Sequence, residues 1–125
     1  YRSGRMTADM NAWGKVVREA VAGLADEAVQ RRSWFGLGPE VSSPDEAFNQ
    51  FFGDAAIEEF LKLPENGLNQ QQHDACAALV EMMETLSKYT PQSISPDTLI
   101  DDPRWVAIRA QAAQVSRLLS LEQRP

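Results

Sequence analysis

Apolar residues recur along this chain at intervals of three and four, the spacing that places side chains on one face of an α-helix. Three stretches carry the pattern over several turns, at residues 8–31, 69–89 and 103–121. Their apolar positions are Met10, Trp13, Val17, Ala20, Leu24 and Ala28 in the first, Cys76, Leu79, Val80, Met83 and Leu86 in the second, and Trp105, Ile108, Ala112, Val115 and Leu119 in the third. The pattern predicts three long amphipathic helices that bury these stripes against one another.

Helix-capping residues place a short helix after the first long one. Ser43 fits the N-cap position, with Pro44 at the first helical position and Glu46 at the third, which is the capping-box pattern. We expect this helix to bury four apolar side chains, namely Ala47, Phe48, Phe51 and Phe52. Gly53 is expected to end it, because a residue without a side chain adopts the left-handed turn readily.

A second short helix is predicted directly after this turn. Asp54 is expected to cap it through its carboxylate. The apolar residues that it turns inward are Ile57, Phe60 and Leu61. Pro64 ends it, because proline disfavours helical geometry in the residue before it.

The second half of the chain repeats these signals. Asn69 and Gln72 stand three residues apart and form a capping pair at the start of the helix over 69–89, which Pro91 closes. One helical turn is expected after Ser95, and Asp102 followed by proline predicts the start of the last helix.

The first long helix has its own start, end and weak points. Thr7 is expected to cap it through the hydroxyl, and Arg31 suits the negative end of the helix dipole. Gly14 and Gly23 each weaken a helix by roughly 1 kcal/mol relative to alanine, so we expect a neighbouring element to pack closely at both. Residues 34–39 contain two glycines and a proline and are predicted to form a loop.

No segment alternates apolar and polar residues over the length of a strand, and no hairpin signal separates β-branched runs. The prediction is therefore an all-α, single-domain helical bundle of three long and two short helices over residues 6–121. Met6 followed by threonine is typical of a natural start, so residues 1–5 are expected to be upstream additions. Residues 122–125 lack apolar anchors and are expected to fray.

Composition narrows the classes of function. The 125 residues are 43% hydrophobic, which is typical of one packed soluble domain. No apolar stretch approaches the ~20 residues of a membrane span. A single cysteine and a single histidine exclude a disulfide framework and argue against most zinc sites. Together with the missing signal sequence, these features favour the cytoplasm.

The net charge of −6 argues against sequence-independent binding to nucleic acid or to anionic lipid. The charge is also unevenly distributed along the chain. Residues 1–39 carry six basic and four acidic side chains, residues 40–103 two basic and thirteen acidic, and residues 104–125 four basic and one acidic.

This distribution has two interpretations. The basic outer helices lie against the acidic middle of the chain and form surface ion pairs worth under ~1 kcal/mol each. Alternatively, the acids form a face that receives a basic partner and speeds its association. The residues proposed for this acidic face are Glu40, Asp45, Glu46, Asp54, Glu58 and Glu59.

Two aromatic residues, Trp34 and Phe35, begin the glycine-rich loop that precedes these acids. Aromatic side chains in such a loop either plug the end of the bundle or stand exposed as anchors for a partner. If they are exposed, they have the composition of interface hot spots, with the acids as a polar rim. We therefore include both among the candidate partner-binding residues.

Candidate catalytic and metal sites are less well supported. Helical di-metal sites use glutamate three residues before histidine, but Gln70 holds that position before His73. Asp74, Glu81 and Glu84 fall roughly on one helix face, a pattern that a solvated face also gives. Cys76 follows His73 by three residues, but it lies on the apolar stripe, which favours a buried structural thiol over a nucleophile.

The remaining motifs carry no chemistry. Gly36 and Gly38 have neither the preceding strand nor the lysine of a phosphate-binding loop. The paired carboxylates at 58–59 and 101–102 are adjacent in sequence, so their side chains diverge and do not form an acid–base dyad. We predict no catalytic, metal or cofactor site.

The aromatic loop and the capping box follow one another directly, as Trp34-Phe35-Gly36-Leu37-Gly38-Pro39-Glu40 running into Ser42-Ser43-Pro44-Asp45-Glu46. With its small size and acidity, the chain resembles the small, acidic, helical immunity proteins that bacteria make against their own toxins. The resemblance implies tight binding to a cognate toxin, such as a nuclease whose basic substrate groove the acidic face would block.

We therefore interpret the chain as a non-enzymatic protein-binding module, with an immunity protein as the specific form. The alternative is a helical structural or oligomerisation subunit that pairs with itself or a larger assembly through its apolar stripes. A third hypothesis is an enzyme with an acid-lined pocket, which would show a requirement for a divalent metal ion.

Overall fold

The structure of the chain is a computed structural model, and it describes residues 2–39, 42–88 and 95–122, with side chains from residue 10 to residue 120 of those ranges. Helices account for most of these residues, and the described ranges contain no strand, which confirms the all-α prediction. In chain order the elements are α1 (Arg2–Ala25), α2 (Glu27–Trp34), α3 (Pro44–Asn49), the π-helical turn η1 (Gln50–Asp54), α4 (Ile57–Lys62), α5 (Gln70–Lys88), α6 (Pro96–Leu99) and α7 (Pro103–Glu122).

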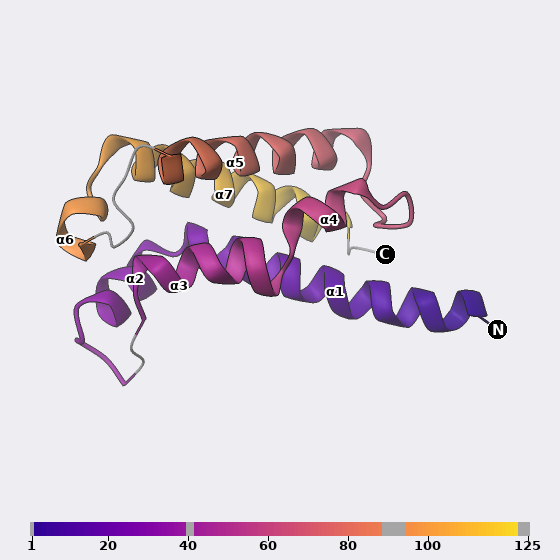
Figure 1. The fold of residues 1–125 in the computed structure, drawn as a ribbon, viewed down its shortest axis with the longest axis horizontal. Coiled ribbons are helices and arrows are strands. Elements are labelled where there is room, and N and C mark those ends of the chain that lie inside the picture. The colour runs from indigo at the N-terminus through magenta and orange to yellow at the C-terminus, as the bar shows by residue number, and fades with distance from the viewer. Residues whose placement is uncertain (1, 40–41, 89–94, 123–125) are drawn as a thin grey trace.

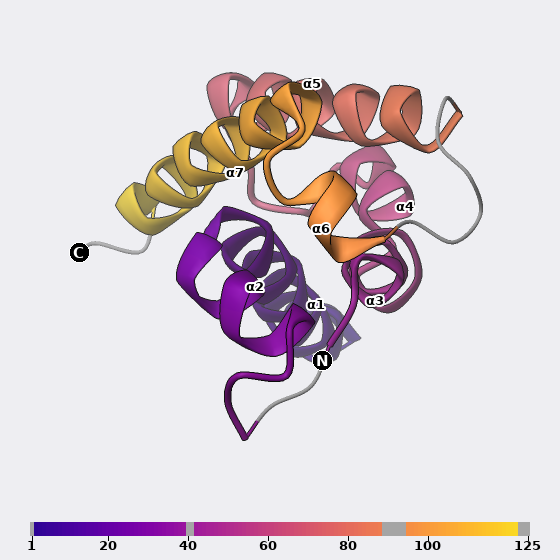
Figure 2. The ribbon, with the colours of Figure 1, turned by 90° about the vertical axis from the view of Figure 1, so that its left-hand side faces the viewer.

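The three long helices form the frame of the bundle. α7 packs against both α1 and α5, and α4 contacts α5 while η1 contacts α1 (Figure 1). The end view shows α1 and α2 on one side below α7, with α3 and α4 beside them below α5 (Figure 2). α3, η1 and α4 therefore cover the side of the α1–α5 pair that α7 leaves open (Figure 2).

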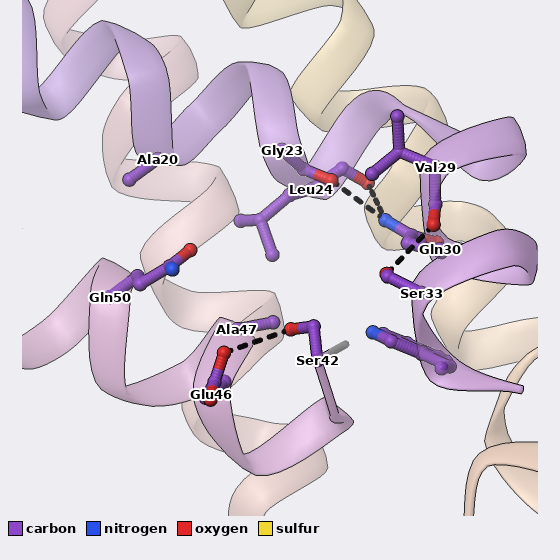
Figure 3. Close-up of a pocket in the computed structure, with 11 residues that line it drawn as sticks. Ala20, Gly23, Leu24, Val29, Gln30, Ser33, Ser42, Glu46, Ala47 and Gln50 are labelled. Carbon is purple, nitrogen blue, oxygen red and sulfur yellow. Dashed lines mark hydrogen bonds between the residues drawn. The ribbon is translucent and has the colours of Figure 1, made fainter. Parts of the chain in front are cut away.

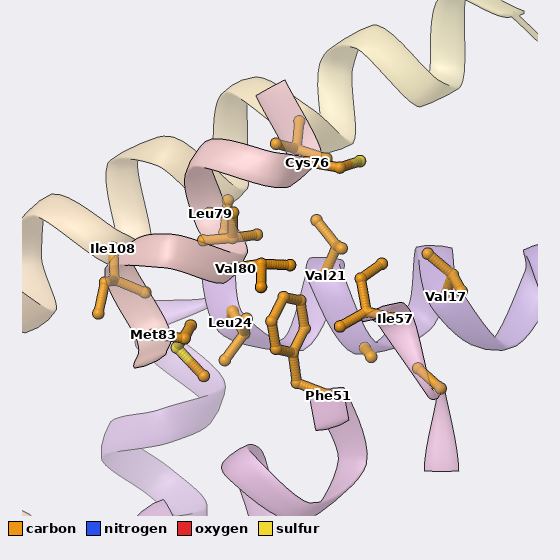
Figure 4. Close-up of a cluster of buried hydrophobic side chains, with 14 of the residues drawn as sticks. Val17, Val21, Leu24, Phe51, Ile57, Cys76, Leu79, Val80, Met83 and Ile108 are labelled. Atoms are coloured by element: carbon orange, nitrogen blue, oxygen red, sulfur yellow. The ribbon is translucent and has the colours of Figure 1, made fainter. Parts of the chain in front are cut away.

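The core lies where these elements meet (Figure 4). Val21 and Leu24 of α1 face Leu79 and Met83 of α5, and all four are at most 1% exposed. Phe51 of η1 enters the same cluster and is also 1% exposed. Except for Ala28, the apolar residues predicted to line the three long helices are buried or packed against this core. This burial of apolar area supplies the main stabilisation of the bundle.

The prediction of one helix over residues 8–31 was wrong at Asp26. Its side chain accepts a hydrogen bond from the Val29 N–H at 3.0 Å and caps a separate helix, α2. The chain changes direction there, so Ala28 is exposed rather than part of the stripe. Thr7 lies inside α1, which begins at Arg2, and therefore does not start the helix. A periodic pattern does not reveal such a break, because α2 has apolar residues of its own.

The predicted stop at Gly53 was also wrong. α3 runs on into η1, where the Ala55 N–H donates to the Gln50 carbonyl at 2.8 Å, five residues back. The left-handed residue is Ala56, with φ of 45°, and this residue instead of Asp54 occupies the N-cap position of α4. The displacement is consistent with burial, since Ala55 and Ile57 on either side of the turn are both fully buried.

The other helix starts are confirmed. The Ser43 hydroxyl accepts from the Glu46 N–H at 3.2 Å. At the start of α5, the Gln72 N–H donates to the Asn69 side chain and the Asn69 N–H donates to the Gln72 side chain, each at 2.8 Å. α4 ends two residues before Pro64, and α6 and α7 begin after Ser95 and Asp102 as predicted. The predicted closure at Pro91 lies outside the described residues. Of residues 122–125, which were expected to fray, Glu122 is the last residue of α7 and the other three lie outside the described residues.

Candidate functional site

A buried glutamine organises the end of the bundle where α1 gives way to α2. The amide of Gln30 donates to the carbonyls of Gly23 at 2.8 Å and Leu24 at 3.0 Å, the last turn of α1 (Figure 3). Its side-chain oxygen accepts from the Trp105 indole N–H at 3.1 Å. Gln30 is 3% exposed and pairs with three polar groups, of which the Gly23 carbonyl also accepts from the Asp26 N–H at 3.4 Å. This network fixes α2 against both α1 and α7.

Trp34, at the end of α2, lies directly against this network. Its ring centroid is 5.5 Å from that of Trp105, and only 8% of the residue is exposed. The loop aromatics were expected either to plug the end of the bundle or to stand exposed as anchors for a partner. Trp34 plugs the end of the bundle. Phe35 differs, because 40% of it is exposed, and Leu37 two residues later is 75% exposed.

A groove separates α1 from α3 and η1 next to Trp34. It consists of a cavity of about 420 Å³ that adjoins one of about 220 Å³, and Ala20 and Gln50 line both cavities. We call these two cavities together the α1–α3 groove. Ala20, Gly23 and Leu24 lie on its α1 side, and Glu46, Ala47 and Gln50 lie opposite (Figure 3).

The indole nitrogen of Trp34 distinguishes it from the other two tryptophans. The Trp13 N–H donates to the Ala55 carbonyl at 2.6 Å, and Trp105 donates to Gln30. Within the described ranges, the Trp34 N–H has no hydrogen-bond partner, yet no fully buried side-chain nitrogen or oxygen there is unpaired. The Trp34 nitrogen therefore keeps access to solvent, and Trp34 lines the α1–α3 groove.

The predicted acidic face is divided between two places. Glu46 lines the larger cavity of the groove and Asp54 the smaller one, so the structure brings these two acids to the same groove. Asp45 and Glu59 are exposed on α3 and α4. Glu58 faces α5 instead, where its carboxyl hydrogen-bonds with Glu84. Glu40 lies outside the described residues.

The contact between Glu58 and Glu84 affects proton binding. The hydrogen bond from one carboxyl to the other raises the pKa of Glu58, and partial burial and repulsion from Glu84 and Glu59 add to the shift. Lys62 opposes it. Two carboxylates in hydrogen-bond contact repel each other when both are ionised, so the Glu58–Glu84 pair holds a proton more readily than an isolated glutamate does.

Arginines of the outer helices form ion pairs with acids near the α2 end of the bundle. Arg31 contacts Glu27 at 2.8 Å and Asp101 at 2.7 Å, and Arg109 contacts Glu27 at 3.5 Å. The pair with Asp101 joins the basic first part of the chain to the acidic middle part, as the first interpretation of the charge pattern expects. A further pair, between Arg104 and Asp102, lies at the start of α7.

None of the described residues of the predicted acidic face takes part in an ion pair found within the described ranges. The Glu46 carboxylate accepts a hydrogen bond from the Ser42 hydroxyl at 3.0 Å, which leaves acceptor capacity on its oxygens. Negative charge therefore stays available to solvent along α3, η1 and α4.

The reactive residues are held in structural roles. Cys76 is 1% exposed, as expected of a buried structural thiol, and burial raises its pKa to about 11. His73 Nε2 lies 3.0 Å from the Leu61 carbonyl and ties α5 to α4. In the part of the chain that the structure describes, no three histidine, cysteine or carboxylate side chains gather where they could hold a metal ion.

Sequence reasoning missed part of the groove. Glu19 and Val16 of α1 line its smaller cavity, and Gln50 lines both. A signal existed at Gly23, for which we predicted close packing. No neighbouring atom lies within 4 Å of the position that a Cβ would take at Gly23, so the glycine widens the groove instead. At Gly14 the prediction of a close neighbour is confirmed, because a Cβ there would lie 3.3 Å from the Arg18 side chain and 3.9 Å from Phe60.

Fold and site together define a small all-α bundle with an acidic groove between α1 and α3. No protein-family model matches the chain, and no curated protein or solved structure matches it either. Among the described helices, none has both the length and the hydropathy needed to cross a membrane.

Proposed function

We propose that this chain is a non-enzymatic protein-binding module whose acidic surface receives a basic partner protein. The observation that carries the proposal is the distribution of ion pairs. Arg31, Arg104 and Arg109 pair with acids outside the segment from Asp45 to Glu59. Four acids of that segment stay exposed or line a groove, namely Asp45, Glu46, Asp54 and Glu59. Negative charge that forms no ion pair within the described residues attracts a positively charged surface and speeds its association.

The specific form that we propose is an immunity protein, which would neutralise a basic toxin domain such as a nuclease. A nuclease needs a positively charged groove to hold phosphates, and an acidic surface of matching shape would occupy that groove. The small size, the acidity and the aromatic loop before the capping box support this proposal.

The direct experiment is isothermal titration against purified, catalytically inactivated basic nuclease toxin domains. We expect a saturable complex at micromolar concentration or below. In rapid-mixing experiments on the same pair, the association rate should fall as salt rises from about 0.05 M to 0.5 M, because the Debye length is then only a few ångströms. A panel in which no domain binds at micromolar concentration would contradict the proposal.

Charge reversal separates a docking surface from a general charge effect. In the double variant Asp45→Lys/Glu59→Lys, association should slow by about tenfold or more at low salt. The matched control is Glu81→Lys/Asp97→Lys, which changes the net charge equally at exposed acids of α5 and α6. If the two double variants slow association to the same extent, the face does not direct docking.

A second candidate function, self-association as a structural subunit, is favoured by the exposed apolar side chains of Phe35 and Leu37. Large apolar groups that stay exposed on a small protein are typical of contact surfaces. Light scattering should then give a mass that rises with concentration and is insensitive to salt, and the double variant Phe35→Ser/Leu37→Ser should remain monomeric. A constant monomer mass for the parent chain would exclude this function.

A further inference from the structure

The α1–α3 groove combines three features that bear on what it can bind. Its walls carry small side chains, Ala20 and Ala47, and the empty Cβ position of Gly23. Small residues at a groove let another backbone come close. The part of α1 from Val16 to Leu24 spans about 12 Å at 1.5 Å per residue, enough for two turns of a helix or a short extended segment.

The second feature is the hydrogen-bond donor at its end. Trp34 is more than nine-tenths buried, and its indole N–H has no partner among the described residues although the side chain lines the groove. Burying this N–H beneath a partner would cost free energy unless the partner supplied an acceptor. A main-chain carbonyl is such an acceptor, and every peptide segment carries one at each residue.

The third feature is its charge. Glu46 lines the larger cavity, and Glu19 and Asp54 line the smaller one, while no lysine or arginine is among the described residues that line either. A neutral ligand would leave these carboxylates uncompensated in a partly closed space. A cationic ligand would form charge-assisted hydrogen bonds with them.

We infer that the α1–α3 groove binds a short basic segment of a partner protein. An arginine or lysine side chain of that segment would meet the Glu46 carboxylate, and one of its main-chain carbonyls would accept from the Trp34 indole N–H. The inference rests on the proposed function, because it assumes a basic protein partner. It goes further by placing the partner's anchor between α1 and α3 rather than on the exposed acids of α4.

The probe for this site is an acetylated and amidated ten-residue peptide of alternating arginine and alanine, added to the ¹⁵N-labelled protein. The three indole N–H signals report on the three tryptophans separately, and the variant Trp34→Phe identifies that of Trp34. We expect the Trp34 signal to shift and saturate, while those of Trp13 and Trp105 stay in place because they already have partners. A peptide with glutamate in place of arginine should cause no shift.

A matched pair of variants tests the site by filling the groove in one variant and leaving it open in the other. Gly23→Leu places a side chain into open space, so it should fold normally and weaken peptide binding at least tenfold. Ala22→Leu adds the same side chain at the neighbouring exposed position, which does not line the groove, and should bind as the parent does. Thermal unfolding of both variants shows whether they are folded.

Several results would overturn the inference. A peptide that leaves the Trp34 signal unchanged, or one that binds Gly23→Leu as well as the parent, would show that the groove is not the site. An equal shift from spermidine would show a site for small cations and not for a peptide. If the backbone amides of Asp45 and Glu59 shift while Trp34 does not, the inference fails and the proposed function stands, whereas the proposed function fails only with the toxin-domain titration.

Discussion

Two tryptophans that touch each other show how differently the two sides of this bundle are built. Trp105 is fully buried, and its indole N–H is paired with Gln30. Trp34 packs against it in a tilted arrangement, with ring centroids 5.5 Å apart, but its own N–H is without a partner in the described part of the chain and lies at the α1–α3 groove. Adjacent side chains of one type thus belong to a closed region and to an open one.

The difference shows which polar groups stabilise the fold and which are available to a ligand. In the closed region, Gln30 pairs with the end of α1 and with Trp105 together, so its loss would remove buried hydrogen bonds to both. In the open region, the polar groups of Trp34 and Glu46 keep capacity for further hydrogen bonds. Stability should therefore respond to changes in the first region, and binding to changes in the second.

The largest effect is expected from Gln30→Ala, which would open the closed region. The variant removes the partner of the buried Trp105 N–H and one donor each from the Gly23 and Leu24 carbonyls, and should lower the free energy of unfolding by ~2–3 kcal/mol. Chemical denaturation measures the loss. Gln71→Ala, at an exposed glutamine of α5, is the control and should change little. Equal stability of the two variants would mean that the Gln30 network does not hold α2 in place.

Ser43→Ala should have the next largest effect, because α3 forms one wall of the groove. The variant removes the acceptor of the Glu46 N–H and should cost ~1 kcal/mol of unfolding free energy. Ser87→Ala, at an exposed serine of α5, is the matched control. If Ser43→Ala unfolds at the same temperature as the parent protein, the placement of the α3 cap is wrong.

Gly23→Ala should raise the free energy of unfolding, in contrast to the two preceding variants. Alanine favours the helix by up to ~1 kcal/mol over glycine, and nothing lies within 4 Å of the new methyl group. Gly14→Ala should gain less, since its methyl group would press on the Arg18 side chain at 3.3 Å. Thermal unfolding of the two variants compares the open and the packed glycine, and a greater gain at Gly14 would contradict the description of the groove.

The smallest effect concerns pH and the Glu58–Glu84 pair. Because the pKa of Glu58 is raised in the folded protein, its contribution to stability is greatest at pH below the ordinary glutamate value and is lost as the pH rises through the raised pKa. Glu84→Gln removes the repulsion between two ionised groups. Compared with the parent protein, the variant should therefore gain more stability at pH 7 than at pH 4. Glu81→Gln is the control, and unfolding temperatures across this range that match for both variants would exclude the coupling.

The sequence predicted the closed region better than the open one. Periodic apolar spacing identified most of the core on the long helices, and capping residues such as Ser43 and Asn69 located helix starts, because both signals are local. The break at Asp26 and the π turn before Ala56 were missed, since each depends on which distant side chains need burial. Without that break, the position of Trp34 and the groove beside it could not be predicted.

The candidate site was predicted only in part, for the same reason. The acids of residues 45–59 were recognised from charge alone, but charge does not tell that Glu46 and Asp54 face α1 while Glu58 faces Glu84. Gly23 carried a signal that was interpreted as close packing. A glycine in a helix is equally consistent with an open groove, and only the position of α3 decides between the two.

The central claim is that Trp34 offers its indole N–H to a basic segment in the α1–α3 groove. Hydrogen–deuterium exchange of the three indole N–H groups tests it most directly, with and without the arginine–alanine peptide. In the free protein Trp34 should exchange at the rate of a solvent-accessible indole, while Trp13 and Trp105 exchange only when the structure opens, and saturating peptide should slow Trp34 alone. A Trp34 signal as protected as that of Trp105 before any peptide is added would contradict the account.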